Sequence, residues 1–337
     1  GGAGYELSGR GLARWLPDAR LRRLYPLTTD AERAAMRESI QLRVPLEQGI
    51  EALERQYLNV VTRIEQWVRQ PGSYVDATGV VFEVPEASRQ QAGERILAAW
   101  RRETSTRQSR AATGYGFMLD LAHMHLGDLP TLGAGFEHIE HLLLDDMQLS
   151  SDPSAFLRHF PRLRYLGLAD NHLAAVPPQV AHMSQLRGLN MRANRLVGSA
   201  ESFSALGSGS ALQDLLLEGN SIASLPRGWP AADAFAHLQR LDISDNGLQL
   251  NEADWQRIAR LPALRTLDVS FNSIRLSPSS VAALARMTRL RQLHLHYNPL
   301  GLPPDVGAMG QLRVLGLSRT EIDHVPPGLW HLLGQPR

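Results

Sequence analysis

Residues 290–300 read LRQLHLHYNPL. This stretch is a clear copy of a pattern that recurs along the chain and predicts its fold. Leucines stand at its positions 1, 4 and 6, an asparagine at position 9 and a further leucine at position 11. The same order recurs along the chain, and successive position-4 residues lie 22 to 26 residues apart, which predicts about nine stacked units of one kind. Clear copies begin at Leu163, Leu186, Leu212, Leu238, Leu264 and Leu290, weaker copies begin at Ile139 (with Met147 at position 9) and Leu312 (with Thr320 there), and an initial copy holds Leu119, Leu121, Met124 and Leu126.

The spacing within one copy predicts its local structure. In the stretch L-x-L, both leucines point to one side of a short strand and the residue between them points to the other. Where the chain turns after the strand, the asparagine amide can satisfy backbone groups, and stacked copies predict a ladder of such bonds. The ladder residues are Asn171, Asn194, Asn220, Asn246, Asn272 and Asn298.

No single unit can bury its own apolar side, so the units must stack. The repeats are similar to leucine-rich repeats, and the predicted fold class is α/β, a leucine-rich-repeat solenoid with a curved parallel sheet on its concave side. The convex side is expected to mix extended segments, such as Val176-Pro177, with short helices over residues 251–261 and 278–287.

The first part of the chain has a different pattern. Residues 29–32, Thr-Asp-Ala-Glu, form a capping box that predicts the start of a helix, and a longer helix follows with an apolar stripe from Leu46 to Val68. A third helix is expected to start at Ser88. We predict a helical region over residues 1–113 that caps the open edge of the repeats, which then occupy residues 114–337.

The composition excludes several kinds of chemistry. All 35 basic residues are arginine, 34 residues are acidic, the net charge is +1, and the chain has no cysteine. Thiolate catalysis, disulfides and lysine Schiff bases are therefore excluded. The charge balance argues against binding to nucleic acid or anionic lipid, and no apolar run is long enough to span a membrane. We expect no cofactor.

Histidine and carboxylate groups are the candidates for metal binding or catalysis. His294 and His296 lie two apart on a strand and face the same way, with Asp242 or Asp268 as a conceivable third zinc ligand. Carboxylate pairs on the same face could meet the distance needed for glycosidase-like chemistry, but an open sheet does not exclude water. We expect no metal site and no catalytic residue in this chain.

A binding surface is the better interpretation of the concave side. Its outward strand positions are predicted to be positions 2, 5 and 7, with position 8 just after each strand. An acidic centre on this side runs into Phe271, His294, His296 and Tyr297. Aromatic and arginine side chains are common anchors of protein interfaces, so a protein partner with a basic, partly apolar patch is predicted. The predicted partner-binding residues are Arg192, Leu216, Glu218, Asp242, Asp245, Asp268, Phe271, His294, His296, Tyr297 and Arg319.

More narrowly, the chain resembles the recognition half of the novel E3 ubiquitin ligase (NEL) effectors of Gram-negative bacteria. The residues that carry the resemblance are the helical stripe Leu46–Val68, Trp100-Arg101-Arg102, and the repeats that begin at Leu163 and Leu290. In that family a helical domain after the repeats carries a catalytic cysteine, which this chain lacks, and the best-known members have shorter repeats of about twenty residues. The resemblance implies substrate recognition by the concave face.

Two functions follow from these patterns. The first is the substrate-recognition domain of a bacterial effector that is secreted, acts in the host cytoplasm, binds a host protein and meets the ubiquitin machinery through a further domain. On this interpretation we expect the chain to continue past Arg337. The alternative is a stand-alone structural or scaffold repeat protein without enzymatic function.

Overall fold

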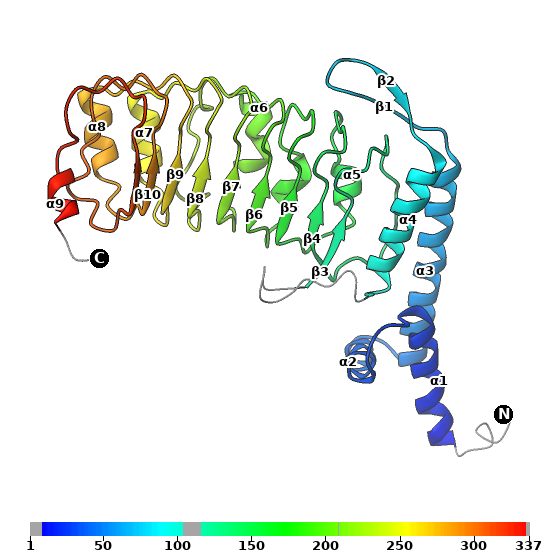
Figure 1. The fold of residues 1–337 in the computed structure, drawn as a ribbon. Coiled ribbons are helices and arrows are strands. Elements are labelled where there is room, and N and C mark those ends of the chain that lie inside the picture. The colour runs from blue at the N-terminus through cyan, green and yellow to red at the C-terminus, as the bar shows by residue number, and fades with distance from the viewer. Residues whose placement is uncertain (1–8, 104–115, 208, 335–337) are drawn as a thin grey trace. The chain divides into compact units, whose positions relative to one another are not determined.

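The computed structural model describes residues 9–103, 116–207 and 209–334 (Figure 1). Its contacts divide the chain into two compact units. The first unit consists of Gly1–Asp76, Val80–Leu143 and Ala155–Pro161, and the second of Ala77–Gly79, Leu144–Ser154 and Arg162–Arg337. The domain boundary predicted between residues 113 and 114 lies outside the described residues.

Four helices build most of the first unit: α1 (Gly9–Leu24), α2 (Asp30–Gln41), α3 (Leu46–Arg69) and α4 (Glu86–Trp100). The predicted capping box at the start of α2 is present, because Thr29 accepts from the Glu32 backbone and Glu32 accepts from the Thr29 backbone. Helix α1 was not predicted; Pro17 lies inside it, and an interior proline argues against a helix. Helix α4 begins at Glu86, two residues before the expected start.

A short hairpin follows α3 and was also missed. Strands β1 (Ser73–Val75) and β2 (Val81–Glu83) pair antiparallel, with Tyr74 opposite Phe82 and their rings stacked 5.4 Å apart. Most side chains of the two strands are exposed, so they show no alternation between buried and exposed positions that a sequence pattern could reveal.

Helices α3 and α4 pack against the first repeats within this unit. Arg89 of α4 is buried and donates to the Leu126 carbonyl at 2.9 and 3.0 Å, and Trp67 of α3 donates to the Asp128 carbonyl at 2.7 Å. The Trp100 indole donates to the Ala134 carbonyl at 3.1 Å. Large buried side chains therefore satisfy backbone carbonyls of the loop that joins β3 (Phe117–Asp120) to β4 (Ile139–Leu143).

The repeats form a parallel sheet of nine strands in the order β11-β10-β9-β8-β7-β6-β5-β4-β3, which confirms the predicted fold class. Equivalent leucines lie in register, as Leu241 beside Leu267 and Leu267 beside Leu293, and all three are fully buried. The strands of the second unit are β5 (Tyr165–Gly167), β6 (Gly188–Asn190), β7 (Asp214–Leu216), β8 (Arg240–Asp242), β9 (Thr266–Asp268), β10 (Gln292–His294) and β11 (Val314–Gly316).

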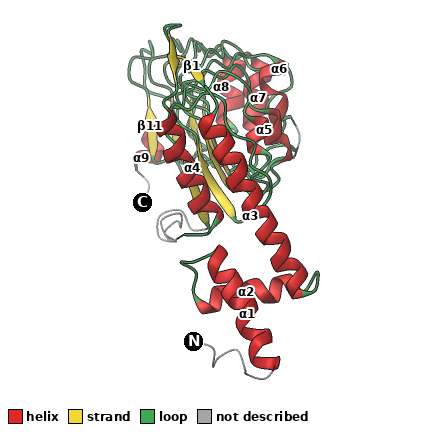
Figure 2. Ribbon diagram, turned by 90° about the vertical axis from the view of Figure 1, so that its right-hand side faces the viewer, coloured by secondary structure: helices red, strands yellow, loops and turns green. Residues whose placement is uncertain are grey.

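The opposite side of the second unit is mixed, as predicted. Helices α7 (Glu252–Ala259) and α8 (Pro278–Ala285) occupy the two segments for which helices were expected, and Trp255, Ile258 and Leu284 are buried. Figure 2 shows α6, α7 and α8 together on one side of the strands. The remaining short helices of this unit are η3 (Pro178–His182), α6 (Ala200–Phe203), η4 (Ser204–Leu206) and α9 (Leu329–Leu333), while α5 (Ser154–Leu157) belongs mostly to the first unit.

The position-9 asparagines are buried and hydrogen-bonded between repeats. Asn246 Nδ2 donates to the carbonyls of Leu217, Ile243 and Ser244 at 3.1, 3.1 and 2.8 Å. Its Oδ1 accepts from the Ile222 backbone at 3.1 Å. The side chains of Asn171, Asn194, Asn220, Asn272 and Asn298 make bonds of the same kind.

Within the described part of the chain, none of the helices is both long enough and apolar enough to cross a membrane.

Candidate functional site

The strands place two outward positions of each repeat on one exposed sheet surface. Each strand of the second unit covers motif positions 3 to 5, as in β10, where Leu293 at position 4 is buried between Gln292 and His294. Positions 3 and 5 therefore point to the same side of the sheet, and Gln292 Oε1 and His294 Nε2 lie 3.1 Å apart. We call the surface formed by positions 3, 5, 7 and 8 of these repeats the strand face.

The prediction of position 2 as an outward strand position is wrong. Position 2 precedes each strand, and the outward strand positions include position 3 instead. Position 3 lies two residues before position 5, and side chains two residues apart on a strand point to the same side, so the sequence could have identified it. The missed residues are Tyr165, Gly188, Asp214, Arg240, Thr266, Gln292 and Val314.

Two predicted binding residues at position 5 have a structural role at the strand end. Asp242 Oδ1 accepts from the Ser244 backbone at 2.9 Å and from its hydroxyl at 2.6 Å. Asp268 Oδ1 accepts from the Ser270 backbone at 3.0 Å, and Asn190 does the same for Arg192 at 3.1 Å. Asp242 is only 6% exposed, so its carboxylate is largely withdrawn from the surface, whereas Asp268 is half-buried.

Asp242→Asn is expected to raise the free energy of unfolding at neutral pH. Burial raises the pKa of Asp242, and the Asp268 carboxylate adds to this increase while the Ser244 bonds oppose it. A raised pKa means that ionised Asp242 is less favourable in the folded than in the unfolded state. The destabilisation is therefore present above the folded-state pKa and disappears as the pH falls below both pKa values. Asparagine at residue 242 would keep the Oδ1 acceptor, because Asn190, at position 5 of another repeat, accepts from the Arg192 backbone through its Oδ1.

Urea unfolding at neutral pH and at a pH below both pKa values measures this effect. The gain should be seen only at neutral pH. Asp245→Asn, on the exposed position 8 of the same repeat, controls for the loss of one surface charge. A loss of stability at neutral pH would show that the ionised carboxylate is required.

Position 8 of each repeat adopts a left-handed backbone conformation. The φ angles of Asp245, Phe271, Tyr297 and Arg319 are 54°, 56°, 55° and 55°, and Gly219 occupies the same position with φ 72°. Apart from Arg319 in the last repeat, each of these turns is fixed by the next repeat, as when the Phe271 N–H donates to the His296 carbonyl at 2.8 Å. The repeat architecture thus requires a conformation that suits glycine better than other residues.

Two of these positions carry exposed aromatic rings. Phe271 is 52% exposed and Tyr297 46% exposed, and their rings stack with centroids 4.4 Å apart and planes 12° apart. We call this pair the aromatic ridge. On neighbouring repeats Asp245 and Arg319 are exposed, so an acidic and a basic side chain stand on either side of the ridge.

The remaining predicted residues lie on the same face. Leu216 is half-buried, and the Arg192 guanidinium pairs with the Glu218 carboxylate at 2.9 Å. The His294 and His296 rings lie 6.1 Å apart, and His296 Nδ1 accepts from the Ser318 backbone at 3.1 Å. Among the described residues there is no group of three or more His, Cys, Asp or Glu side chains that could hold a metal ion.

Gly316→Ala is expected to lower the free energy of unfolding by about 1–2 kcal/mol. A Cβ at Gly316 would lie 2.1 Å from His296 Nε2, so the ring would have to leave its place and its bond to Ser318. Chemical denaturation of this variant is compared with that of Gly310→Ala, where a Cβ meets no atom within 4 Å. Equal effects of the two substitutions would contradict the crowding argument.

The repeated strand, left-handed turn and buried asparagine define a leucine-rich-repeat domain. A family model described as leucine rich repeat matches residues 210–274. No curated protein matches the chain in sequence.

Several solved structures are similar to this chain. A leucine-rich-repeat protein of Leptospira interrogans is 22% identical, with a TM-score of 0.51; the match covers 62% of this chain and 56% of that protein. An internalin of Listeria monocytogenes is 16% identical (TM-score 0.47, covering 79% and 70%), and YopM of Yersinia enterocolitica is 23% identical (TM-score 0.42, covering 63% and 40%). The chain thus spans little more than half of the Leptospira protein, and that likeness supports the fold alone.

Proposed function

We propose that this chain is a protein-interaction module that binds a protein partner on the strand face, with the aromatic ridge as its anchor. The observation that carries the proposal is the placement of Phe271 and Tyr297. Both are about half exposed and both have a positive φ, a conformation that is costly for bulky side chains. Strained, exposed residues of this kind point to function, because the folded core gains little from them.

The charges beside the ridge suggest the chemistry of the partner. Asp245 is exposed on the repeat before Phe271, and the half-buried Asp268 belongs to the same repeat as Phe271. The Glu218 charge is already paired with Arg192. A partner that presents a basic side chain beside an apolar one would stack on the ridge and meet these carboxylates.

Capture from host lysate followed by mapping of the bound face tests this proposal. The intact chain is compared with Asp245→Arg on the strand face and with Arg260→Glu on the exposed end of α7. Loss of the captured protein with Asp245→Arg, and retention with Arg260→Glu, would support binding by the strand face. The opposite pattern would place the interface on the helical side and overturn the proposal.

We propose further that the module is the substrate-recognition part of a secreted effector of the NEL ligase type, acting on a host protein. The resemblance of the helical stripe and the repeats supports this. The chain has no cysteine, so the ligase chemistry would have to come from another segment.

The product of the complete gene, incubated with ubiquitin, activating enzyme and conjugating enzyme, tests this second proposal. Cysteine-dependent ubiquitin chains are expected, with residues 1–337 alone as the inactive control. If no chains form, the ligase assignment is wrong, and the module is a stand-alone binding or scaffold protein.

A further inference from the structure

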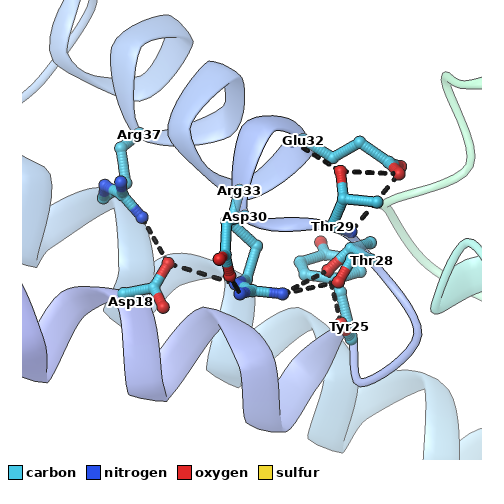
Figure 3. A network of polar contacts seen from close by, with 8 residues as sticks. All are labelled: Asp18, Tyr25, Thr28, Thr29, Asp30, Glu32, Arg33 and Arg37. Carbon is cyan, nitrogen blue, oxygen red and sulfur yellow. Dashed lines mark hydrogen bonds and ion pairs between the residues drawn. The ribbon is translucent and has the colours of Figure 1, made fainter.

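Helix α2 is held to its neighbours at both ends. At its start the Arg33 side chain, 2% exposed, pairs with Asp18 of α1 at 3.1 Å and with Asp30, and donates to the Thr28 carbonyl at 2.6 Å (Figure 3). Near its other end, Ile40 lies so close to Gly49 of α3 that a Cβ there would be 2.2 Å from the isoleucine methyl group. Only a glycine allows this approach.

Between these two attachments lies a cavity of about 450 Å³ that is open to solvent on one side. Its apolar wall consists of Tyr25, Ala35, Met36, Ile40 and Leu53. Both the size and the apolar lining are typical of small-molecule sites, in which a few polar groups orient a mainly apolar ligand.

The Arg102 guanidinium is the unusual polar group of this cavity. Arg102 follows α4 with a φ of 54°, and its Cζ lies 5.7 Å from the centre of the Tyr25 ring. Its Nε is buried and has no hydrogen-bond partner among the described residues. Burial lowers the pKa of Arg102, although Tyr25, Glu137 and Glu32 act in the opposite direction. A buried cationic donor without a partner is unfavourable until an acceptor reaches it.

The other charged groups at the cavity leave a place for an anion. Glu32 also lines it, and its Oε1 accepts from the Thr29 backbone and hydroxyl at 3.3 and 3.1 Å, so this carboxylate takes part in the capping box (Figure 3). Arg43 adds a second cation to the lining. The cavity therefore combines an apolar wall with two guanidinium groups and one engaged carboxylate.

We propose that this cavity binds a small amphipathic anion, with its acidic head on Arg102 and its aliphatic chain between α2 and α3. A carboxylate has the planar pair of acceptors that a guanidinium prefers, and Met36, Ile40 and Leu53 would cover a chain of methylene groups. This site is separate from the strand face and does not depend on the function proposed for that face.

Calorimetric titration of the full chain with decanoate tests the proposal, with 1-decanol as the neutral probe of equal chain length. Decanoate should bind, and the affinity for 1-decanol should be lower by a factor of about ten or more, as expected for loss of a charge-assisted hydrogen bond. Arg102→Met should weaken decanoate binding by the same factor and leave the binding of 1-decanol unchanged.

Two further variants test whether the probes occupy the cavity itself. Met36→Trp fills the cavity without changing its charge and should abolish binding of both probes. Arg55→Met removes an exposed cation from α3 and should leave decanoate binding unchanged. Absence of decanoate binding to the unaltered chain, or equal binding to the Arg102→Met variant, would overturn the proposal. Unfolding curves of each variant establish that it is folded.

Discussion

Replacing Asn246 with alanine is expected to lower the free energy of unfolding by about 1–3 kcal/mol. The asparagine side chain makes four hydrogen bonds, three to carbonyls and one from the Ile222 N–H, and it lies inside the stack of repeats. Alanine makes none of them, and water cannot reach these backbone groups easily. The loss therefore reflects unsatisfied buried groups more than the missing bonds themselves.

Equilibrium unfolding in urea measures this loss. Gln249→Ala is the matched control, because Gln249 is an exposed amide three residues further along, and its backbone N–H still bonds to the Ala223 carbonyl after the substitution. We expect the control to unfold like the unaltered chain. If Asn246→Ala also unfolded at the same midpoint, the ladder of asparagines would not be what holds successive turns together.

Removing the aromatic ridge is expected to weaken partner binding without unfolding the protein. Phe271→Gly combined with Tyr297→Gly should reduce the affinity for an authenticated partner about thirtyfold or more, the effect expected when a central anchor of an interface is lost. The measurement is a dissociation constant from calorimetry or surface binding, once capture has supplied the partner.

The stability of the same variant follows from opposing effects. Glycine relieves a left-handed conformation that costs other residues about 1–2 kcal/mol each. Against this, the stacked pair contributes about 0.5–1.5 kcal/mol, and each glycine adds about 0.5–1 kcal/mol of chain entropy to the unfolded state. Taken at the midpoints of these ranges the effects nearly cancel, so the free energy of unfolding is expected to change by about 1 kcal/mol or less, measured in urea.

Phe82→Ala, which removes an exposed ring from the β1–β2 hairpin of the first unit, serves as the control for general loss of aromatic surface. Partner affinity that survives loss of the ridge would place the anchor elsewhere on the domain. A large drop in stability would instead show that the two rings serve the fold.

The first unit was anticipated less completely than the repeats. The stripe of α3 and the capping box of α2 are local patterns of apolar spacing and hydrogen-bonding side chains, so the sequence reveals them. The cavity beside α2 has no such pattern, because Arg102 and Leu53 line it together only after α3 and α4 have packed. Contacts between residues so far apart in the chain follow from packing alone.

The solenoid of this protein follows from its sequence alone. A period of 22 to 26 residues, with leucines at positions 1, 4 and 6 and an asparagine at 9, specifies which side chains are buried and how each unit stacks on the next, because burial alternates along a strand. The same pattern also located the outward position-5 residues and the position-8 aromatics.

Which of those residues remain available for binding depends on the tertiary structure. His296 lies over Gly316 of the next repeat, and Phe271 and Tyr297 are turned outward by a left-handed bend that the next repeat fixes. The physical reason is that hydrogen-bond acceptors and open space come from neighbouring strands. Those neighbours lie a full repeat away along the chain, and the pattern within one repeat carries no information about them.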